Sequence, residues 1–210
     1  MEHEFWHERW EIGDLGFHQE DYNPPLLRHW HRLDLPAAAR VFLPLCGKTK
    51  DMLWLAQQGY DVLGVELSEF AVQSFFKEHG LDVAQDRVGP FARYQSDRIQ
   101  ILCGDFFSLT PALLHDVTAV FDRGSLIALP PAMRIRYVGK LKALLQPPAK
   151  TLMLTLAHEE ELFSPPPHPV YDDEVRSLYQ PWCEVEFLET TETVVKGYTI
   201  PQSSYLLQVK

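Results

Sequence analysis

Polar segments follow four of the short apolar runs in this 210-residue chain, and three of the four carry a carboxylate. They are residues 44–48, Glu66, residues 104–107, and the pair Asp122 and Arg123. Open α/β sheets bind ligands at the carboxyl ends of their strands, and an acidic residue about 20 positions after the first loop suits both hydroxyls of a ribose. The pattern predicts a nucleoside site around Glu66, although a solvated strand end explains Glu66 equally well.

The glycine pattern disfavours ligands that are held by their phosphates. Gly47, Lys48 and Thr49 resemble the end of a phosphate-binding loop, but Phe42 stands where that loop needs its first glycine. A GxGxxG fingerprint is absent after the first strand, which disfavours a nicotinamide-dependent oxidoreductase as the different-class alternative. A nucleoside without phosphates fits better. S-adenosylmethionine is such a ligand, and its sulfonium cation tolerates an acidic site.

The other two strand ends each allow two interpretations. Asp105 is placed to address an adenine amino group, with Phe106 beside the ring, but a turn or N-cap aspartate after a glycine is common. Asp122 and Arg123 are adjacent and opposite in charge, as in structural ion pairs. Their position at a strand end makes Arg123 a second candidate for the site.

Composition limits the partners. A net charge of -10 repels nucleic acids and anionic lipids, and no segment is long enough to span a bilayer or has the pattern of a secretory signal. Three cysteines without CxxC spacing favour a reducing cytoplasm, and Cys46 is expected to be a buried, inert thiol. His3 and His7 have the i, i+4 spacing of metal ligands but lack a third partner, so no metal site is expected.

These strand ends require a mainly parallel sheet to position them. From Arg40 the chain alternates β-branched runs with helical patterns, which predicts βαβ units in one domain over residues 1–210. Strands are expected at 41–43, 61–66, 99–103, 117–121, 151–156, 184–189 and 204–209, and helices at 24–33, 51–58, after Ser68, and at 130–144. Residues 81–97 are interpreted as an irregular insertion. Residues 158–171 contain four prolines and are expected to form a stiff loop that covers the active site.

Five segments together resemble the thiopurine S-methyltransferase family. They are FWHERW with GFHQ near the N-terminus, VFLPLCGK, GVELS, GDFF and DRGSL, in family order up to about Tyr137. The last third resembles the family mainly in its proline-rich loop. The resemblance implies the class I S-adenosylmethionine-dependent methyltransferase fold, a seven-stranded, mostly parallel sheet with helices on both faces and a final antiparallel strand.

The resemblance also implies roles for individual residues. Those expected to contact S-adenosylmethionine are Trp10, Leu45, Glu66 and Arg123, with Asp105 and Phe106 near its adenine, while Phe17 and Arg123 face the acceptor. Residues 1–22 are expected to fold over the cofactor as a lid. The implied protein is a cytoplasmic monomer.

The implied reaction is transfer of a methyl group to the sulfur of a thiopurine or a related aromatic or heterocyclic thiol. No general base is assigned, because a thiol is partly ionised near neutral pH, and Arg123 is hypothesised to favour its anionic form. Two alternatives stay open beside the oxidoreductase. One is methylation of selenium or tellurium oxyanions as detoxification, and the other is a non-catalytic adenosylmethionine-binding module.

Overall fold

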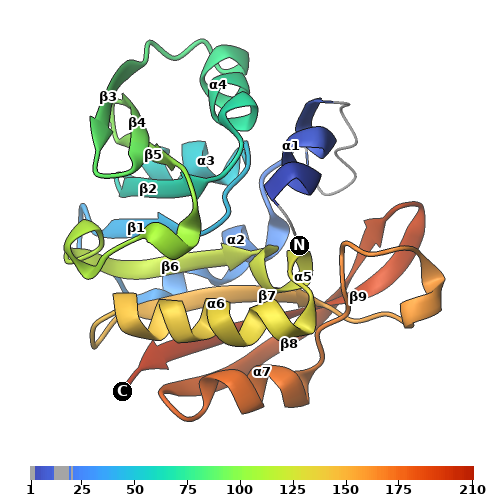
Figure 1. The fold of residues 1–210 in the computed structure, drawn as a ribbon. Helices are drawn as coiled ribbons and strands as arrows, with labels where there is room; N and C mark the ends of the chain where they lie inside the picture. The colour runs from blue at the N-terminus through green and yellow to red at the C-terminus, as the bar shows by residue number, and fades with distance from the viewer. Residues whose placement is uncertain (1–2, 12–18, 20) are drawn as a thin grey trace.

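A nine-stranded sheet forms the centre of the computed structural model, which describes residues 3–11, 19 and 21–210. The strand order is β3-β4-β5-β2-β1-β6-β7-β9-β8 (Figure 1). Five neighbouring strands are parallel: β5 (Ile99–Cys103), β2 (Asp61–Glu66), β1 (Arg40–Leu43), β6 (Val117–Arg123) and β7 (Lys150–Leu156). The antiparallel pair β9 (Tyr198–Val209) and β8 (Cys183–Val195) completes the seven strands that were predicted.

Two further strands show that the interpretation of residues 81–97 as irregular was wrong. β3 (Ala84–Val88) and β4 (Phe91–Ser96) form an antiparallel hairpin, and β4 pairs with β5 at the edge of the sheet. The side chains of β3 are nearly all exposed, so its sequence lacks the apolar alternation by which a half-buried strand is recognised. β4 places Phe91 and Tyr94 in the core, whereas β3 only packs the half-buried Val88 against it.

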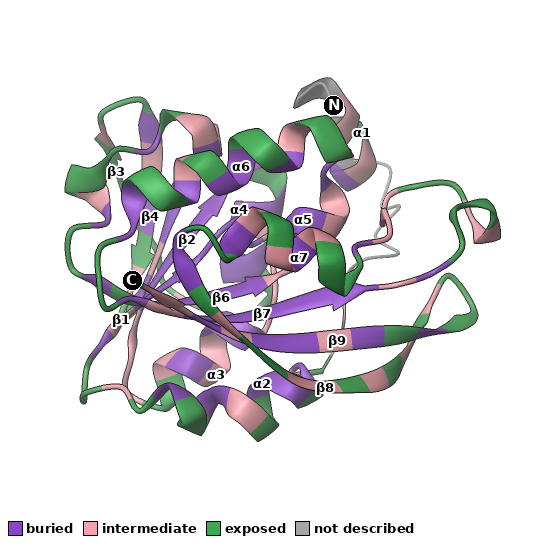
Figure 2. Ribbon diagram, turned by 90° about the horizontal axis from the view of Figure 1, so that it is seen from below, coloured by how far each residue is buried: buried purple, intermediate pink, exposed green. Residues whose placement is uncertain are grey.

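Helices cover both faces of this sheet (Figure 2). Successive side chains of a strand point to opposite faces, so Val41 and Leu43 pack on one side while Phe42 packs on the other. The first face is covered by α2 (Pro24–His29), η1 (Trp30–Leu33), α3 (Asp51–Gln57) and α4 (Glu69–Glu78). The second is covered by α5 (Ser125–Ala128), α6 (Pro131–Leu144) and α7 (Asp172–Tyr179). The remaining helices are α1 (His3–Glu11), η2 (Phe106–Ser108), η3 (Pro111–Leu113) and η4 (Glu160–Leu162).

Local signals in the sequence account for most helix boundaries. The Ser68 hydroxyl accepts the N–H of Ala71 and caps α4 as predicted, and Gly59 ends the turn after α3 at a φ of +90°. α7 was not predicted, because its start at Asp172 follows the proline-rich loop directly. In the part of the chain that the structure describes, no helix is both long and apolar enough to cross a membrane.

Candidate functional site

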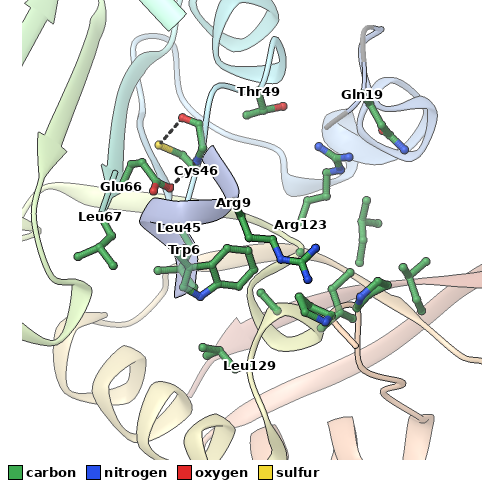
Figure 3. A pocket seen from close by; sticks show the side chains of 18 of the residues that line it. Trp6, Arg9, Gln19, Leu45, Cys46, Thr49, Glu66, Leu67, Arg123 and Leu129 are labelled. Atoms are coloured by element: carbon green, nitrogen blue, oxygen red, sulfur yellow. Dashed lines mark hydrogen bonds between the residues drawn. The ribbon is translucent and has the colours of Figure 1, made fainter. Parts of the chain in front are cut away.

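A pocket of about 240 Å³ opens where the carboxyl ends of the parallel strands meet. Its lining includes six of the seven residues expected in the site: Trp10, Leu45, Glu66, Asp105, Phe106 and Arg123. Figure 3 shows Glu66, Leu45 and Arg123 around this space, with Trp6 and Arg9 of α1 reaching across it. The seventh, Phe17, lies outside the described residues, as does most of the expected lid that follows α1. The residues at the strand ends therefore border one cavity, and their roles toward a ligand stay predictions.

Glu66 ends β2 and is buried at 6% exposure, so it is not a solvated strand end. Its Oε2 accepts the N–H of Gly47 and its Oε1 accepts the N–H of Ser68, both at 2.8 Å. Burial raises the pKa of this carboxyl, and the hydrogen bonds from the backbone partly oppose the rise. A carboxylate oxygen can accept two hydrogen bonds, and each Glu66 oxygen accepts one of the bonds from Gly47 and Ser68. Glu66 therefore retains capacity for hydroxyl donors of a ligand.

The loop after β1 brings its backbone unusually close to α1. Leu45 has a φ of +47° and Gly47 a φ of +54°, in the left-handed region that a residue with a side chain seldom adopts. A Cβ on Gly47 would lie 3.1 Å from the Trp10 ring, so glycine allows the indole to pack on the loop. Trp10 is thereby buried at 3% exposure. α1 covers one side of the pocket through this contact.

Both interpretations of Asp105 agree with the structure. Its Oδ1 accepts the N–H of Phe107 at 2.9 Å and caps η2, and the residue also lines the pocket. Phe106 follows on the same short helix and packs on Tyr137 with ring centroids 4.8 Å apart. The cap orients the turn that holds Phe106 against the pocket.

Asp122 and Arg123 point to opposite faces of β6, as adjacent strand residues do. Asp122 is buried and accepts the hydroxyl of Tyr137 at 2.7 Å, and burial raises the pKa of its carboxyl. Arg123 pairs with the buried Asp51, whose Oδ2 lies 3.8 Å from its Nη1. Burial lowers the pKa of Arg123, and the Asp51 charge opposes this, so the guanidinium remains a cation in the pocket wall.

The far end of the pocket was not predicted in full. It is formed by the proline-rich loop, by α5 and α6, and by the β8–β9 turn, through Ile127, Leu129, Met133, Pro166, Pro167, Thr193, Val194, Val195 and Lys196. The two late strands were expected to end near 189 and to begin near 204, but they extend to Val195 and from Tyr198. Gly197, which has a φ of +82°, is a turn signal between these strands that was available in the sequence.

The Cys46 thiol and the possible metal ligands near the pocket were two further candidates for chemistry. Cys46 lines the pocket, and burial, together with the Glu66 charge, raises the pKa of its thiol well above the ordinary value. The thiol stays protonated, as expected of an inert cysteine. Among the residues that the structure describes, no three His, Cys, Asp or Glu side chains are grouped to hold a metal ion. The side chains of His3 and His7 lie outside that description.

Known proteins resemble this chain in sequence and in fold. The thiopurine S-methyltransferase family model matches residues 1–203. Thiopurine S-methyltransferase of Pseudomonas fluorescens strain Pf0-1 is 45% identical over 203 residues, covering 97% of this chain and 93% of its own. That of Pseudomonas entomophila strain L48 is 49% identical over 194 residues, covering 91% and 90%.

A solved structure extends the comparison to the fold. It is 1,6-didemethyltoxoflavin-N1-methyltransferase of Burkholderia thailandensis with bound S-adenosylhomocysteine, which aligns with a TM-score of 0.69 at 14% identity, covering 99% of this chain and 87% of that one.

Proposed function

Because this chain belongs to the thiopurine S-methyltransferase family, whose members depend on S-adenosylmethionine, we propose that its pocket binds this cofactor at the Glu66 end and a heterocyclic thiol at the other. The observation that carries the proposal is one continuous cavity with two unlike ends. Carboxylates line the end near β2 and β5, and apolar side chains with two prolines line the end near α5 and α6.

The donor set at the first end fits the cofactor. Glu66 is fixed by Gly47 and Ser68 and accepts the ribose hydroxyls, while Asp105 addresses the adenine amino group. The carboxylates also suit the positive charge of a sulfonium, which is the group that supplies the methyl when the cofactor is bound. The proposal keeps Trp10 and Leu45 as walls of this end, with α1 as part of the lid over residues 1–22.

At the second end, the residues of this chain align the acceptor and exclude water from it. The apolar lining suits a flat heterocycle, and Arg123 provides a cation that favours the thiolate over the thiol. No general base is assigned. Pro166 and Pro167 place the loop 158–171 in the wall, in agreement with its proposed role as a cover.

The direct test is methylation of 6-mercaptopurine by the purified protein with S-adenosylmethionine, followed by detection of the S-methyl product by mass spectrometry. Selenite and tellurite are assayed beside it, because a small anion would also use the Arg123 charge. Turnover of the thiopurine above a no-enzyme control supports the proposal. Turnover of the oxyanions with none of the thiopurine would replace the proposed acceptor. Family membership removes the oxidoreductase and the non-catalytic module from consideration.

A further inference from the structure

The β8–β9 hairpin extends beyond the strand that supports it. β7 ends at Leu156, opposite Gln202 of β9, and the next contact is the N–H of Ala157 to the carbonyl of Pro201 at 3.0 Å. From there β8 and β9 continue as a pair up to Val195 and Tyr198. A two-stranded hairpin is marginally stable by itself in water. The position of the tip therefore depends on contacts outside the sheet.

Two residues of the tip supply such contacts: the Tyr198 ring packs on that of Phe163, with centroids 6.0 Å apart, and Lys196 makes polar contacts. Lys196 and Gly197 form a two-residue turn with φ values of +50° and +82°, the geometry of a tight hairpin turn. The Lys196 Nζ donates to the carbonyl of Ser164 at 2.8 Å and to that of Pro166 at 2.9 Å. It also lies 5.3 Å from the centroid of the Phe163 ring. Figure 1 shows the hairpin tip, in red, beside the orange loop that carries these residues.

The ends of the proline-rich loop are attached elsewhere. The Tyr171 hydroxyl donates to the carbonyl of His158 at 2.8 Å, and the His168 N–H donates to the carbonyl of Ile127 at 2.7 Å. Neither bond involves the hairpin. Lys196 therefore joins the middle of the loop to the tip, and residues of both segments line the far end of the pocket.

We propose that Lys196 is a positioning residue for the acceptor, which sets the width of the far end of the pocket by holding the carbonyls of Ser164 and Pro166. The inference rests on the proposed function, because that function assigns this end to the acceptor. Loss of the two bonds would widen the acceptor end of the pocket alone. Cofactor binding would be unaffected, because the carboxylates proposed to hold the cofactor come from other segments. Lys196 is exposed, so its substitution does not disturb the core.

Three variants test the role. Lys196→Met keeps the apolar stem and removes the donors, Lys196→Arg keeps donors that reach two carbonyls, and Lys210→Met is the matched control. Lys210 also donates its Nζ to a backbone carbonyl, that of Gln180 at 2.7 Å, but it does not line the pocket. The measurements are the KM for 6-mercaptopurine at saturating S-adenosylmethionine, the Kd of S-adenosylhomocysteine, and hydrogen exchange over residues 158–171 without ligands.

Lys196→Met is expected to raise the KM roughly three- to tenfold, as for the loss of exposed hydrogen bonds, with the cofactor Kd unchanged. It is also expected to speed exchange in residues 158–171, and a bulkier arylthiol should lose less kcat/KM than 6-mercaptopurine. Lys196→Arg is expected to resemble the wild type, as is Lys210→Met.

An unchanged KM and unchanged exchange in Lys196→Met would overturn the inference, and so would a rise in cofactor Kd that matches the rise in KM. A wild-type protein without turnover on any thiol would instead refute the proposed function. In that case exchange in residues 158–171 still decides whether Lys196 holds the loop.

Discussion

Substitution of Glu66 separates the observed role of its carboxylate, as a hydrogen-bond acceptor for two loops, from its proposed role as a ligand for the ribose. Glu66→Ala leaves the N–H groups of Gly47 and Ser68 without their acceptor. Each buried, unpaired donor costs about 1–3 kcal/mol, and a domain of this kind is stable by about 5–15 kcal/mol. Water that enters the open pocket reduces the cost, so the variant is expected to fold and to melt at a lower temperature.

The effect on binding is separate from the effect on folding. Without the carboxylate both ribose hydroxyls lose their acceptor, so binding weakens by about 1–3 kcal/mol, which is about 5- to 150-fold in Kd. Calorimetric titration with S-adenosylhomocysteine measures this directly. The control is Glu186→Gln, which removes a charge that pairs with Arg32 on the exposed side of β8. A folded Glu66→Ala variant with an unchanged Kd would refute the ribose assignment.

The pH dependence of binding gives a further test of Glu66. Burial raises the pKa of its carboxyl above the ordinary 4.5. In the free protein, protonation of Glu66 therefore contributes folding stability that is fully present below pH 4.5. This contribution is lost as pH rises through the folded-state pKa. Cofactor affinity changes in the opposite direction, because protonation removes acceptor capacity, so the wild-type Kd should rise as the solution is acidified. Glu66→Gln should show a flatter profile, and identical profiles would exclude titration of Glu66 as the cause.

Two other substitutions examine the walls of the pocket. Arg123→Met is expected to lower turnover at saturating cofactor by about 10- to 100-fold below the thiol pKa of the acceptor, with recovery as pH rises; a variant-to-wild-type ratio that stays flat would exclude the electrostatic role. Gly47→Ala is expected to weaken cofactor binding, because the new Cβ lies 3.1 Å from the Trp10 ring. The control is Gly80→Ala, whose Cβ meets nothing within 4 Å. It has a similar φ of +61° and should lower only the melting temperature. Equal binding by both alanine variants would show that the close approach of Trp10 is unimportant.

Residues at strand ends were predictable because one rule of geometry brings them together. Glu66, Asp105 and Arg123 each follow an apolar run, and parallel strands place their carboxyl ends on the same edge of the sheet. Trp10 and Leu45 carry no such signal. An indole and an isobutyl group have no chemistry that spacing reveals, so only the resemblance to a family placed them in the site.

The parts that were missed depend on contacts between distant segments. The Lys196 turn is visible in the sequence, but its partners lie about 30 residues earlier in a loop whose path no local pattern describes. In the β3–β4 hairpin, β3 is nearly all exposed, so its order depends on pairing with β4, which is held by its pairing with β5 and by the buried Phe91 and Tyr94. Local chemistry in the sequence therefore indicated the strand-end side of the pocket better than the opposite side.

The two ends of the pocket come from different stretches of the gene. The carboxylates and the loop after β1 lie before residue 108, whereas the far end is built mostly from residues 127–133, 166–167 and 193–196. Under the proposed function, mutations in the later stretches would alter which thiols fit while the residues proposed to face the cofactor stay unchanged. Acceptor preference would then be able to change at little cost to the shared chemistry. For the same reason, a library for new acceptors would randomise residues 163–167 and 193–196 together, since Lys196 and the packing of Tyr198 on Phe163 connect the loop to the hairpin.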